Sequence, residues 1–262
     1  MGETDISWAR YTLNPWIGCA HRSEGCRNCY AETMAHRWGW AKWGVNAERR
    51  VTAPSTWAKP IAWDREAAEA GRRERVFCAS LADVFDEHPG VVEPRARLWV
   101  LIQATPHLDW LLLTKRPENI AAMLPPDWDG GYPNVWLGTT VEDQRVAERI
   151  PLLRTVPAAA RFLSCEPLIG QLDLHGRLEG IHEVIVGGES GAHARPMDLA
   201  WARDVVAAAR NAGAAVHVKQ LGAVWSGATG DGRDRADPAG TEIDRFPVDL
   251  RIREYPQIGT AA

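Results

Sequence analysis

Short apolar runs alternate with longer segments of helical periodicity along most of the chain. The apolar runs are rich in leucine and β-branched residues, and they cover residues 75–80, 109–114, 134–139, 161–166, 183–188 and 215–220. Between them, apolar residues recur at helical spacing in 91–105, 116–125, 142–155 and 198–213. Runs of this length are typical of buried strands, and the intervening pattern is typical of amphipathic helices. The alternation predicts repeated βα units around a parallel sheet.

One further strand is expected near the N-terminus, over the apolar residues WIGC at 16–19. We therefore expect an α/β fold in which about six to seven parallel strands form a closed (β/α) barrel or a partial barrel, because strand number alone does not distinguish the two. At 262 residues the chain has the usual length of one such barrel. Residues 1–262 are thus expected to form a single barrel-like domain.

Two segments depart from the alternation. Residues 40–75 form a tryptophan-rich insertion, which contains Trp40, Trp43, Trp57 and Trp63 among charged residues. We expect this insertion either to cover the mouth of the barrel or to pack a small core of its own. From residue 225 onward the chain is rich in Gly, Asp and Arg, which predicts a surface extension.

The overall composition is that of an ordinary globular protein. Hydrophobic residues make up 45% of the chain, but no stretch approaches the roughly 20 uninterrupted apolar residues of a membrane helix. The N-terminus lacks the basic stretch and apolar run of a secretory signal, so we expect a cytoplasmic protein with no membrane partner. Thirty basic residues against 34 acidic ones give a net charge of -4, so the protein surface as a whole is not basic. Binding to nucleic acid would therefore require a local basic patch.

Polar residues and glycines follow abruptly where the expected strands end. In a parallel barrel these ends share one face, and the active sites of such barrels lie there. We expect the side chains at these ends to point toward a common cavity; they belong to Lys115, Glu142, Glu166, Glu189 and Lys219. The alternative is that each residue only marks the place where a strand meets solvent.

Three of the five cysteines crowd into eleven positions, whereas Cys78 and Cys165 stand alone within apolar runs. The clustered residues Cys19, Cys26 and Cys29 have the spacing C-x6-C-x2-C. In a reducing compartment such clustering favours a metal site over disulfides. A [4Fe-4S] cluster normally takes four cysteine thiolates, so three of them would leave one iron open to a small molecule.

A zinc site is the alternative metal centre. Cys26 and Cys29 have the spacing of a common zinc half-site, and His21 or His36 is a candidate fourth ligand of a tetrahedron. His36 follows Cys29 by seven residues, which on a helix returns to the same face about 10 Å farther along the axis. Three cysteines without any metal are the remaining interpretation.

The cysteine motif resembles that of the radical S-adenosylmethionine (SAM) superfamily, in which a three-cysteine loop follows the first strand of a (β/α) barrel. That superfamily typically has the spacing C-x3-C-x2-C, which is three residues shorter. Further segments resemble a phage-associated family of uncharacterised proteins that is known for the longer motif. The resemblance covers about residues 5–225, and these segments carry it: TLNPWIGCAHRSEGCRNCYA, LLLTKRPENI, GTTVEDQ, LSCEPLIG, GGESG and VKQLG.

The resemblance implies a radical-SAM-like fold, a [4Fe-4S] cluster on Cys19, Cys26 and Cys29, and SAM bound at the open iron. The phage-associated family also has a genomic neighbour called the three-Cys-motif partner protein, which is therefore an expected partner. Gly187, Gly188 and Glu189 resemble the Gly-Gly-Glu triplet that holds the methionine amino group in radical SAM enzymes, although that triplet usually follows the second strand.

Other residues are candidates for binding and catalysis at the strand ends. Asp83 is a second candidate for the amino group of SAM, or an ordinary carboxylate at a helix N-terminus. Thr139 and Glu142 are candidate ribose ligands, although GTTVED also reads as a helix start. Lys219 is expected to hold a phosphate or carboxylate, or to neutralise a nearby glutamate. The candidate catalytic residues are Lys115, Glu166 and Cys165, the last either as a hydrogen-atom donor or as buried apolar filler.

The sequence does not favour phosphoryl transfer, because it has no GxxxxGK[ST] phosphate-binding loop. It does not favour peptide hydrolysis either, because it has no GxSxG motif of serine hydrolases and no HExxH motif of zinc proteases. The favoured function is that of a radical-SAM-like iron-sulfur enzyme, with a nucleotide or nucleic acid among its candidate substrates. The alternative is a zinc-binding structural or adaptor protein without catalysis, which would use the tryptophan-rich insertion and local arginines for binding.

Overall fold

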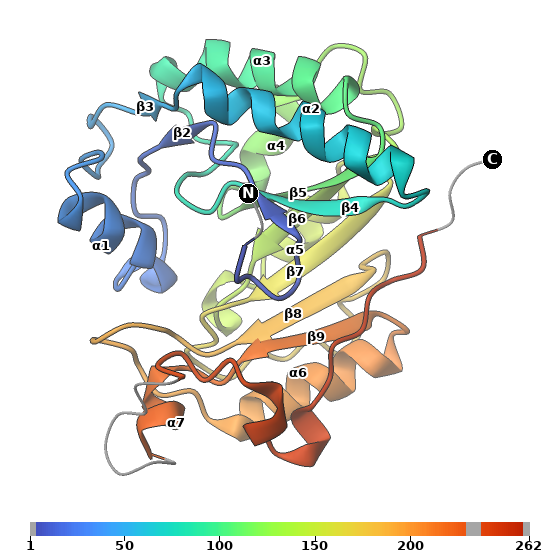
Figure 1. Cartoon of the computed structure of the whole chain (residues 1–262). Coiled ribbons are helices and arrows are strands. Elements are labelled where there is room, and N and C mark those ends of the chain that lie inside the picture. The colour runs from blue at the N-terminus through green and yellow to red at the C-terminus, as the bar shows by residue number, and fades with distance from the viewer. Residues whose placement is uncertain (1–3, 229–236, 259–262) are drawn as a thin grey trace.

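The computed structural model describes residues 4–228 and 237–258, and its centre is one curled sheet of parallel strands (Figure 1). The spatial order of the seven strands follows the chain: β1 (Tyr11–Thr12), β4 (Glu74–Cys78), β5 (Leu108–Thr114), β6 (Val135–Thr140), β7 (Ala160–Cys165), β8 (Glu183–Gly187) and β9 (Ala215–Gln220). The sheet does not close, because β1 and β9 form its two edges. This half-barrel confirms the α/β fold and the partial barrel predicted from the alternating pattern.

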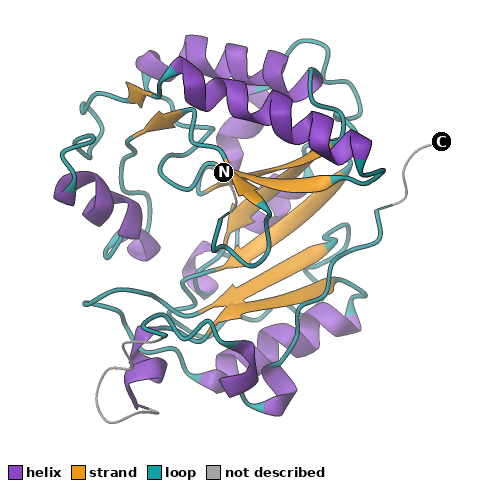
Figure 2. Ribbon diagram, in the orientation of Figure 1, coloured by secondary structure: helices purple, strands orange, loops and turns teal. Residues whose placement is uncertain are grey.

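Helices cover the convex face of the sheet (Figure 2). They are α2 (Pro54–Glu69), α3 (Val92–Gln103), α4 (Ile120–Met123), α5 (Arg149–Arg154) and α6 (Leu199–Asn211). Local sequence sets their ends: the Asp198 side chain accepts a hydrogen bond from the Ala200 N–H at 2.8 Å and caps α6, and Gly213 follows that helix with φ 75°. The short helix α1 (Tyr30–Arg37) lies apart from this layer, on the open side of the half-barrel (Figure 2).

The strands bury both of their faces, in keeping with the period of two along each strand. Residues such as Val76 and Leu112 pack toward the helices in the main core. Their neighbours Phe77 and Leu111 point to the concave side. There they form a second core with Trp136, Phe162, Ile185 and Trp8, the last from the N-terminal segment. This second core fills the amino end of the half-barrel and leaves the carboxyl end for a cavity.

The strand expected at 16–19 is wrong as a member of the main sheet. The first strand of that sheet is β1, five residues earlier, whereas β2 (Trp16–Ile17) pairs antiparallel with β3 (Arg50–Val51) in a separate two-stranded sheet. Pro15 lies between the two apolar stretches and has no N–H to donate, so it is suited to the point where the chain leaves the sheet. The apolar character of Trp16 serves burial instead, since its side chain is fully buried.

The tryptophan-rich segment divides between two environments. Trp57 and Trp63 lie on α2 and belong to the main core. Trp40 and Trp43 lie in the loop before β3, and of these two Trp43 lines the same cavity as the clustered cysteines. The extension from residue 225 includes residues 229–236, which lie outside the described residues. After them, the C-terminal segment runs along β9, where the Glu254 N–H donates to the Val216 carbonyl at 2.8 Å. No helix in the described part of the chain is both long and apolar enough to cross a bilayer.

His217 on β9 is fully buried, and this burial predicts a pH-dependent stability. Burial, together with repulsion from Arg253 and Arg75, lowers the pKa of His217 from 6.5 to about 3. Between these values the unfolded state binds a proton that the folded state does not, so stability falls as the pH falls. The free energy of unfolding should lose about 1.4 kcal/mol per pH unit below about pH 6 and level off near pH 3.

Urea denaturation of the wild type and of His217→Gln between about pH 4 and pH 8, a range that includes the unfolded-state pKa of 6.5, measures this effect. The stability difference between the two proteins should be constant above about pH 7 and shift against the wild type as the solution is acidified. Carboxylates that protonate in both proteins cancel in this difference. Parallel profiles over the whole range would show that His217 gains its proton as easily in the folded state as in the unfolded one.

Candidate functional site

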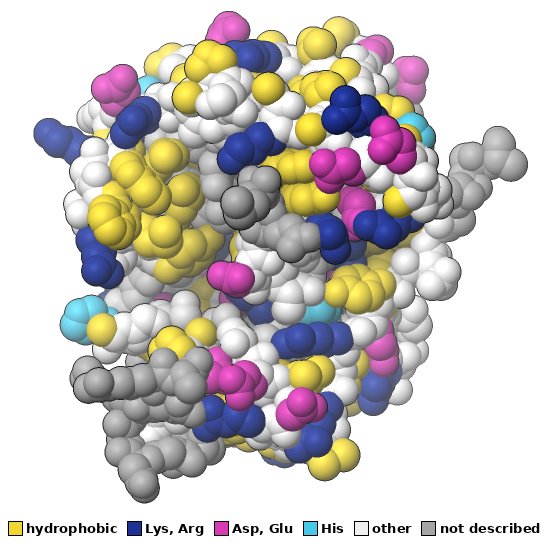
Figure 3. Space-filling view, viewed as in Figure 1, with side chains coloured by type: hydrophobic (Ala, Val, Ile, Leu, Met, Phe, Trp, Pro, Cys, Tyr) yellow, Lys and Arg dark blue, Asp and Glu magenta, His cyan; other side chains and the backbone are white. Residues whose placement is uncertain are grey.

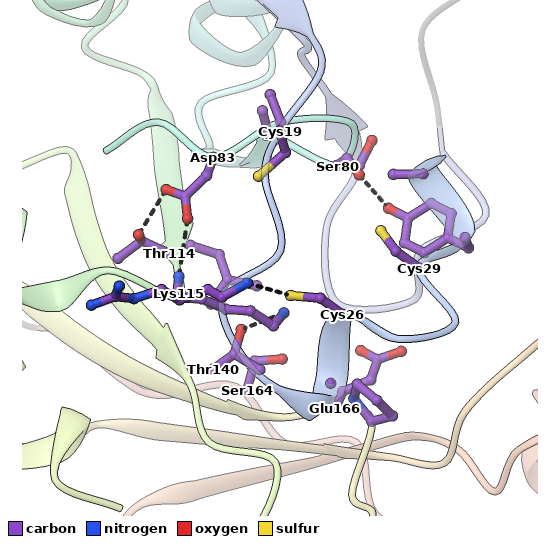
Figure 4. A pocket seen from close by; sticks show the side chains of 18 of the residues that line it. Cys19, Cys26, Cys29, Ser80, Asp83, Thr114, Lys115, Thr140, Ser164 and Glu166 are labelled. Atoms are coloured by element: carbon purple, nitrogen blue, oxygen red, sulfur yellow. Dashed lines mark hydrogen bonds between the residues drawn. The ribbon is translucent and has the colours of Figure 1, made fainter. Parts of the chain in front are cut away.

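A cavity lies at the carboxyl ends of the strands, between the concave face of the sheet and the loop that carries the clustered cysteines. Cys19, Cys26 and Cys29 all line it (Figure 4). The strand ends add polar side chains to the lining, namely those of Lys115, Thr140, Ser164, Glu166 and Lys219. Trp8 and Phe77 add apolar surface from the second core. The cavity therefore combines sulfur donors, cations and a carboxylate above a hydrophobic base.

Short-range backbone contacts fold the cysteine loop. Gly18 has φ 119°, a conformation open to glycine, and a Cβ at this position would lie 3.2 Å from the Arg49 side chain. A 3-10 helix (Glu24–Cys26) and the first residue of α1 then place the next two cysteines. The Cys29 N–H donates to the Cys26 carbonyl at 3.2 Å, so these two cysteines are fixed about one helical turn apart.

Glu142 supports the loop from the end of β6. Its side chain is 1% exposed, accepts a hydrogen bond from Ser23 Oγ, and forms an ion pair with Arg149 at 2.8 Å. Gly25 packs so closely that a Cβ there would lie 2.3 Å from a carboxylate oxygen of Glu142. Glu142 does not line the cavity. The structure therefore places this carboxylate beneath the loop, where it holds Ser23 and leaves no room for a side chain at residue 25.

Glu189 supports the loop from the other side. It accepts hydrogen bonds from Asn28 Nδ2 at 3.1 Å and from the Arg195 guanidinium at 2.6 Å. Burial acts to raise the pKa of Glu189, but the hydrogen bonds from Arg195 and Asn28 outweigh it and lower that pKa. Gly188 has a packing role as well, because a Cβ there would lie 2.4 Å from the Leu221 carbonyl oxygen. The Gly-Gly-Glu triplet thus joins β8, β9 and the loop, and its carboxylate is already occupied.

Asp83 is also occupied, by partners on the strand beside it. Its carboxylate accepts hydrogen bonds from Thr114 Oγ1 at 2.7 Å, the Lys115 N–H at 3.1 Å and the Arg116 guanidinium at 3.0 Å. Arg116 in turn donates to the Ala20 carbonyl at 2.9 Å and to Cys19 Sγ at 3.7 Å. Asp83 lines the cavity, but its visible function is to orient Arg116 against the first cysteine.

The three thiols differ in their surroundings. Burial raises the pKa of Cys19 to about 12, with a further increase from Asp83 that the nearby Arg116 opposes. Burial also raises the pKa of Cys29. Cys26 Sγ accepts a hydrogen bond from the Arg22 N–H at 3.4 Å. Because a metal binds the thiolate form, metal binding here would release protons and grow stronger with rising pH.

The donor set fits an iron-sulfur cluster better than a closed zinc site. Three thiols face one cavity, and the other two cysteines, Cys78 and Cys165, are buried on the opposite face of their strands. His21 Nε2 contacts Glu32 at 2.6 Å, and His36 is exposed. Within the described residues no group of His, Cys, Asp or Glu converges as a preformed metal site. Three thiols on the wall of one cavity, with no fourth cysteine of the described residues among its lining, fit a cluster that keeps one iron open.

Two lysines of the lining differ in their partners. Lys219 forms an ion pair with Glu166, which neutralises both charges across the ends of β7 and β9. Lys115 Nζ contacts Thr140 Oγ1 at 3.4 Å and has no carboxylate partner among the described residues. Burial acts to lower the pKa of Lys115, but the charges of Glu142 and of the nearby cysteines raise it. Lys115 is therefore a cation available to an anionic ligand.

Besides Glu142, three predicted site residues do not line the cavity, namely Thr139, Cys165 and Gly187. Thr139 and Cys165 point to the convex side of the sheet, where both are fully buried. Thr139 Oγ1 donates to the Thr114 carbonyl at 2.9 Å, and Cys165 belongs to the main core. A Cβ at Gly187 would lie 3.1 Å from the Glu166 side chain, which explains the glycine by packing. Cys165 is fully buried in the main core and does not line the cavity.

Several residues of the site were missed from the sequence. Ser164 lines the cavity one residue before the predicted Cys165, and the period of two along the strand would have selected it. Thr140, which follows the same expected strand as Thr139 and was a candidate ribose ligand with it, also lines the cavity. Asn28 lies between two of the cysteines and anchors Glu189. Arg116 was expected from its position after the strand as a cation of the cavity, but its partners Cys19 and Asp83 were not, because they are far away in the sequence.

The model of a family described as "Protein of unknown function (DUF5131)" matches residues 3–247. No curated protein matches the chain by sequence.

Solved structures of spore photoproduct lyase are similar in fold. A tyrosine-to-phenylalanine mutant of that enzyme gives a TM-score of 0.53 at 12% identity, over 82% of this chain and 77% of the lyase chain. A mutant with dinucleoside spore photoproduct gives 0.47 at 14% identity, over 70% of this chain and 56% of that one. A double mutant with bound AdoMet and dinucleoside spore photoproduct gives 0.47 at 14% identity, over 78% and 61%.

The likeness to the tyrosine-to-phenylalanine mutant shows the fold of the chain, a half-barrel of parallel strands similar to that of spore photoproduct lyase. The chain spans 56% of the length of the lyase mutant with dinucleoside spore photoproduct.

Proposed function

Because the chain belongs to the DUF5131 family of proteins of unknown function, we propose a function from its site: an iron-sulfur enzyme of the radical SAM type. One observation carries the proposal. Cys19, Cys26 and Cys29 line one cavity at the carboxyl edge of a parallel half-barrel, and no fourth cysteine of the described chain reaches it. That edge is where barrels of this kind place their active sites.

In this proposal the three cysteine thiolates hold a 4Fe-4S cluster. If bound there, such a cluster would keep one iron open to SAM and would supply one electron for the reductive cleavage of SAM into methionine and a 5′-deoxyadenosyl radical. The protein itself fixes the thiols through Ser23, Asn28 and Arg116, each of which is bound to a buried carboxylate. The donors are therefore held from three directions before any substrate enters.

The remaining lining residues suit a substrate with an anionic and an apolar part. Lys115 offers a positive charge beside the hydroxyls of Thr140 and Ser164. Trp8, Phe77 and Leu113 offer apolar surface on the same side of the sheet and exclude water from it. We assign the binding of an anionic group to Lys115, while Glu166 and Lys219 remain candidate catalytic and binding residues. Association with the three-Cys-motif partner protein stays a prediction.

The test is anaerobic reconstitution followed by a SAM cleavage assay. The reconstituted protein should be brown, contain about four irons per chain, and release 5′-deoxyadenosine from SAM when dithionite is added. Controls omit either dithionite or SAM. A colourless protein with about one zinc per chain would support the structural zinc site instead. A brown protein that takes up electrons but yields no 5′-deoxyadenosine would contradict the SAM part of the proposal.

A further inference from the structure

An exposed apolar surface lies beside the cavity, on α1 and the loop that follows it. We call it the aromatic shelf and define it by Tyr30, Met34, Trp38, Trp40 and Trp43. Tyr30 is 44% exposed, Met34 38% and Trp38 59%. In Figure 3 hydrophobic side chains gather over this part of the chain, next to a hollow in the surface. Contiguous exposed apolar surface of this kind is typical of a binding site.

Two rings of the shelf, those of Trp38 and Trp40, lie nearly parallel, and more than half of the Trp38 surface is exposed. Trp38 and Trp40 stack with their centroids 6.4 Å apart and an interplanar angle of 21°. The guanidinium of Arg37 lies 5.4 Å from the centroid of the Trp38 ring. An exposed indole with a stacked neighbour and an arginine beside it is suited to bind another planar ring.

The shelf is joined to the cavity by direct contacts. Tyr30 and Trp43 line the cavity together with the three cysteines. Tyr30 Oη donates to the Ser80 carbonyl at 2.7 Å, which fixes its ring at the cavity wall. The Gly44 N–H donates to the Cys19 carbonyl at 2.9 Å, so the loop of the shelf is bound to the cysteine loop. A ligand that lies on the shelf can therefore extend into the cavity.

The charge around the shelf is opposite in sign to that of the whole chain. Residues 21–50 contain six Lys or Arg residues and three Asp or Glu residues, whereas the chain as a whole carries a net charge of -4. Arg37, Lys42 and Arg50 are exposed and form no ion pair among the described residues. Arg50 also donates to the Trp40 carbonyl at 3.2 Å, which places one cation directly against the shelf. The patch is suited to a ligand that carries several negative charges.

We propose that the aromatic shelf binds a single-stranded nucleic acid, with a base stacked on Trp38 and backbone phosphates near Arg37, Lys42 and Arg50. This rests on the proposed function in one respect, because it names the class of substrate presented to the cavity. Single strands expose the faces of their bases for stacking, while a duplex buries them. A second copy of the chain is a poor occupant, because a symmetric contact brings the same cations together from both sides.

Binding of fluorescently labelled oligothymidylate and oligouridylate of about 12 nucleotides, followed by anisotropy, tests the shelf. Trp38→Ala should lower the affinity for at least one of the two oligonucleotides by about 5- to 100-fold. Trp38→Phe should retain most of that affinity, because phenylalanine still offers a ring for stacking. Arg37→Ala and Arg50→Ala should each reduce the salt slope by about one. Arg65→Ala is the matched control, since Arg65 is an exposed arginine on α2, on the convex side. Circular dichroism confirms that each variant is folded.

Three results would overturn the shelf proposal. The first is equal affinity of the wild type and Trp38→Ala for the oligonucleotides, and the second is equal affinity of the wild type for duplex and single strand. The third is a protein that binds no oligonucleotide but forms a concentration-dependent dimer, which Trp38→Ala disrupts. The measurement is made on the chain before and after reconstitution, so it does not depend on the cluster. Trp38-dependent binding by a protein that never cleaves SAM would support the shelf and contradict the proposed function. SAM cleavage without such binding would overturn the shelf alone.

Discussion

Alanine in place of Cys19, Cys26 or Cys29 should leave the reconstituted protein colourless and almost free of iron. Each substitution leaves two thiolates on the loop, which is too few to retain the cubane. Iron and acid-labile sulfide analysis, with the visible absorption spectrum, measures the loss. The effect should be the same for all three positions, because all three side chains line the same cavity.

Cys78→Ala and Cys165→Ala are the matched controls. Both cysteines are fully buried, but each lies in the main core on the convex side of the sheet. Each control exchanges a buried thiol for a methyl group and should keep about four irons per chain. Loss of iron from Cys165→Ala in a folded protein would make that residue a fourth ligand. The cluster would then have no open iron, and electron transfer or a structural role would replace SAM cleavage.

Most of the sheet was predictable because its signal is local. The strands beginning near residues 75, 109, 134, 161, 183 and 215 lie within two residues of their expected ends, since a buried strand needs only a short apolar run between turns. β1 was missed because it has two residues, Tyr11–Thr12, and no run of that length is distinctive. The open edge was not predictable either, because closure depends on the pairing of β1 with β9, which the pattern of single strands does not encode.

The site was predictable as a location and less so as a set of roles. The spacing of Cys19, Cys26 and Cys29 and the polar strand ends indicated one cavity, and the structure places the cysteines with Lys115 and Lys219 there. The binding roles expected for acidic residues depend on which partners already occupy them. Asp83 is bound by Arg116 and Glu189 by Asn28, and the second pair is separated by 161 positions along the chain. A single sequence does not indicate which carboxylates are already bound by side chains that are distant along the chain.

A buried ion pair closes the amino end of the half-barrel, opposite the cavity. Arg75 on β4 and Glu183 on β8 meet in a bidentate contact, with Nη1 3.0 Å from Oε1, although three strands separate β4 from β8 in the sheet. Glu183 is fully buried, and the guanidinium lies 4.9 Å from the ring centroids of Trp136 and Tyr255. Burial raises the pKa of Glu183 against the opposing effect of Arg75.

Arg75→Met should therefore lower the free energy of unfolding by about 3–5 kcal/mol at neutral pH, because it leaves an unpaired carboxylate in the core. Without the arginine the folded-state pKa of Glu183 lies further above its unfolded value, so the loss should be smaller near pH 5 than near pH 8. Arg75→Met with Glu183→Gln should recover part of the stability, since the buried charge is gone.

Arg203→Met is the matched control and should change stability little, because Arg203 and Asp249 are paired at the exposed surface. Urea denaturation of the four proteins at both pH values measures these differences. A double variant no more stable than Arg75→Met would show that the stacking of Arg75 on Trp136 and Tyr255, and not the charge of Glu183, holds the two strands together.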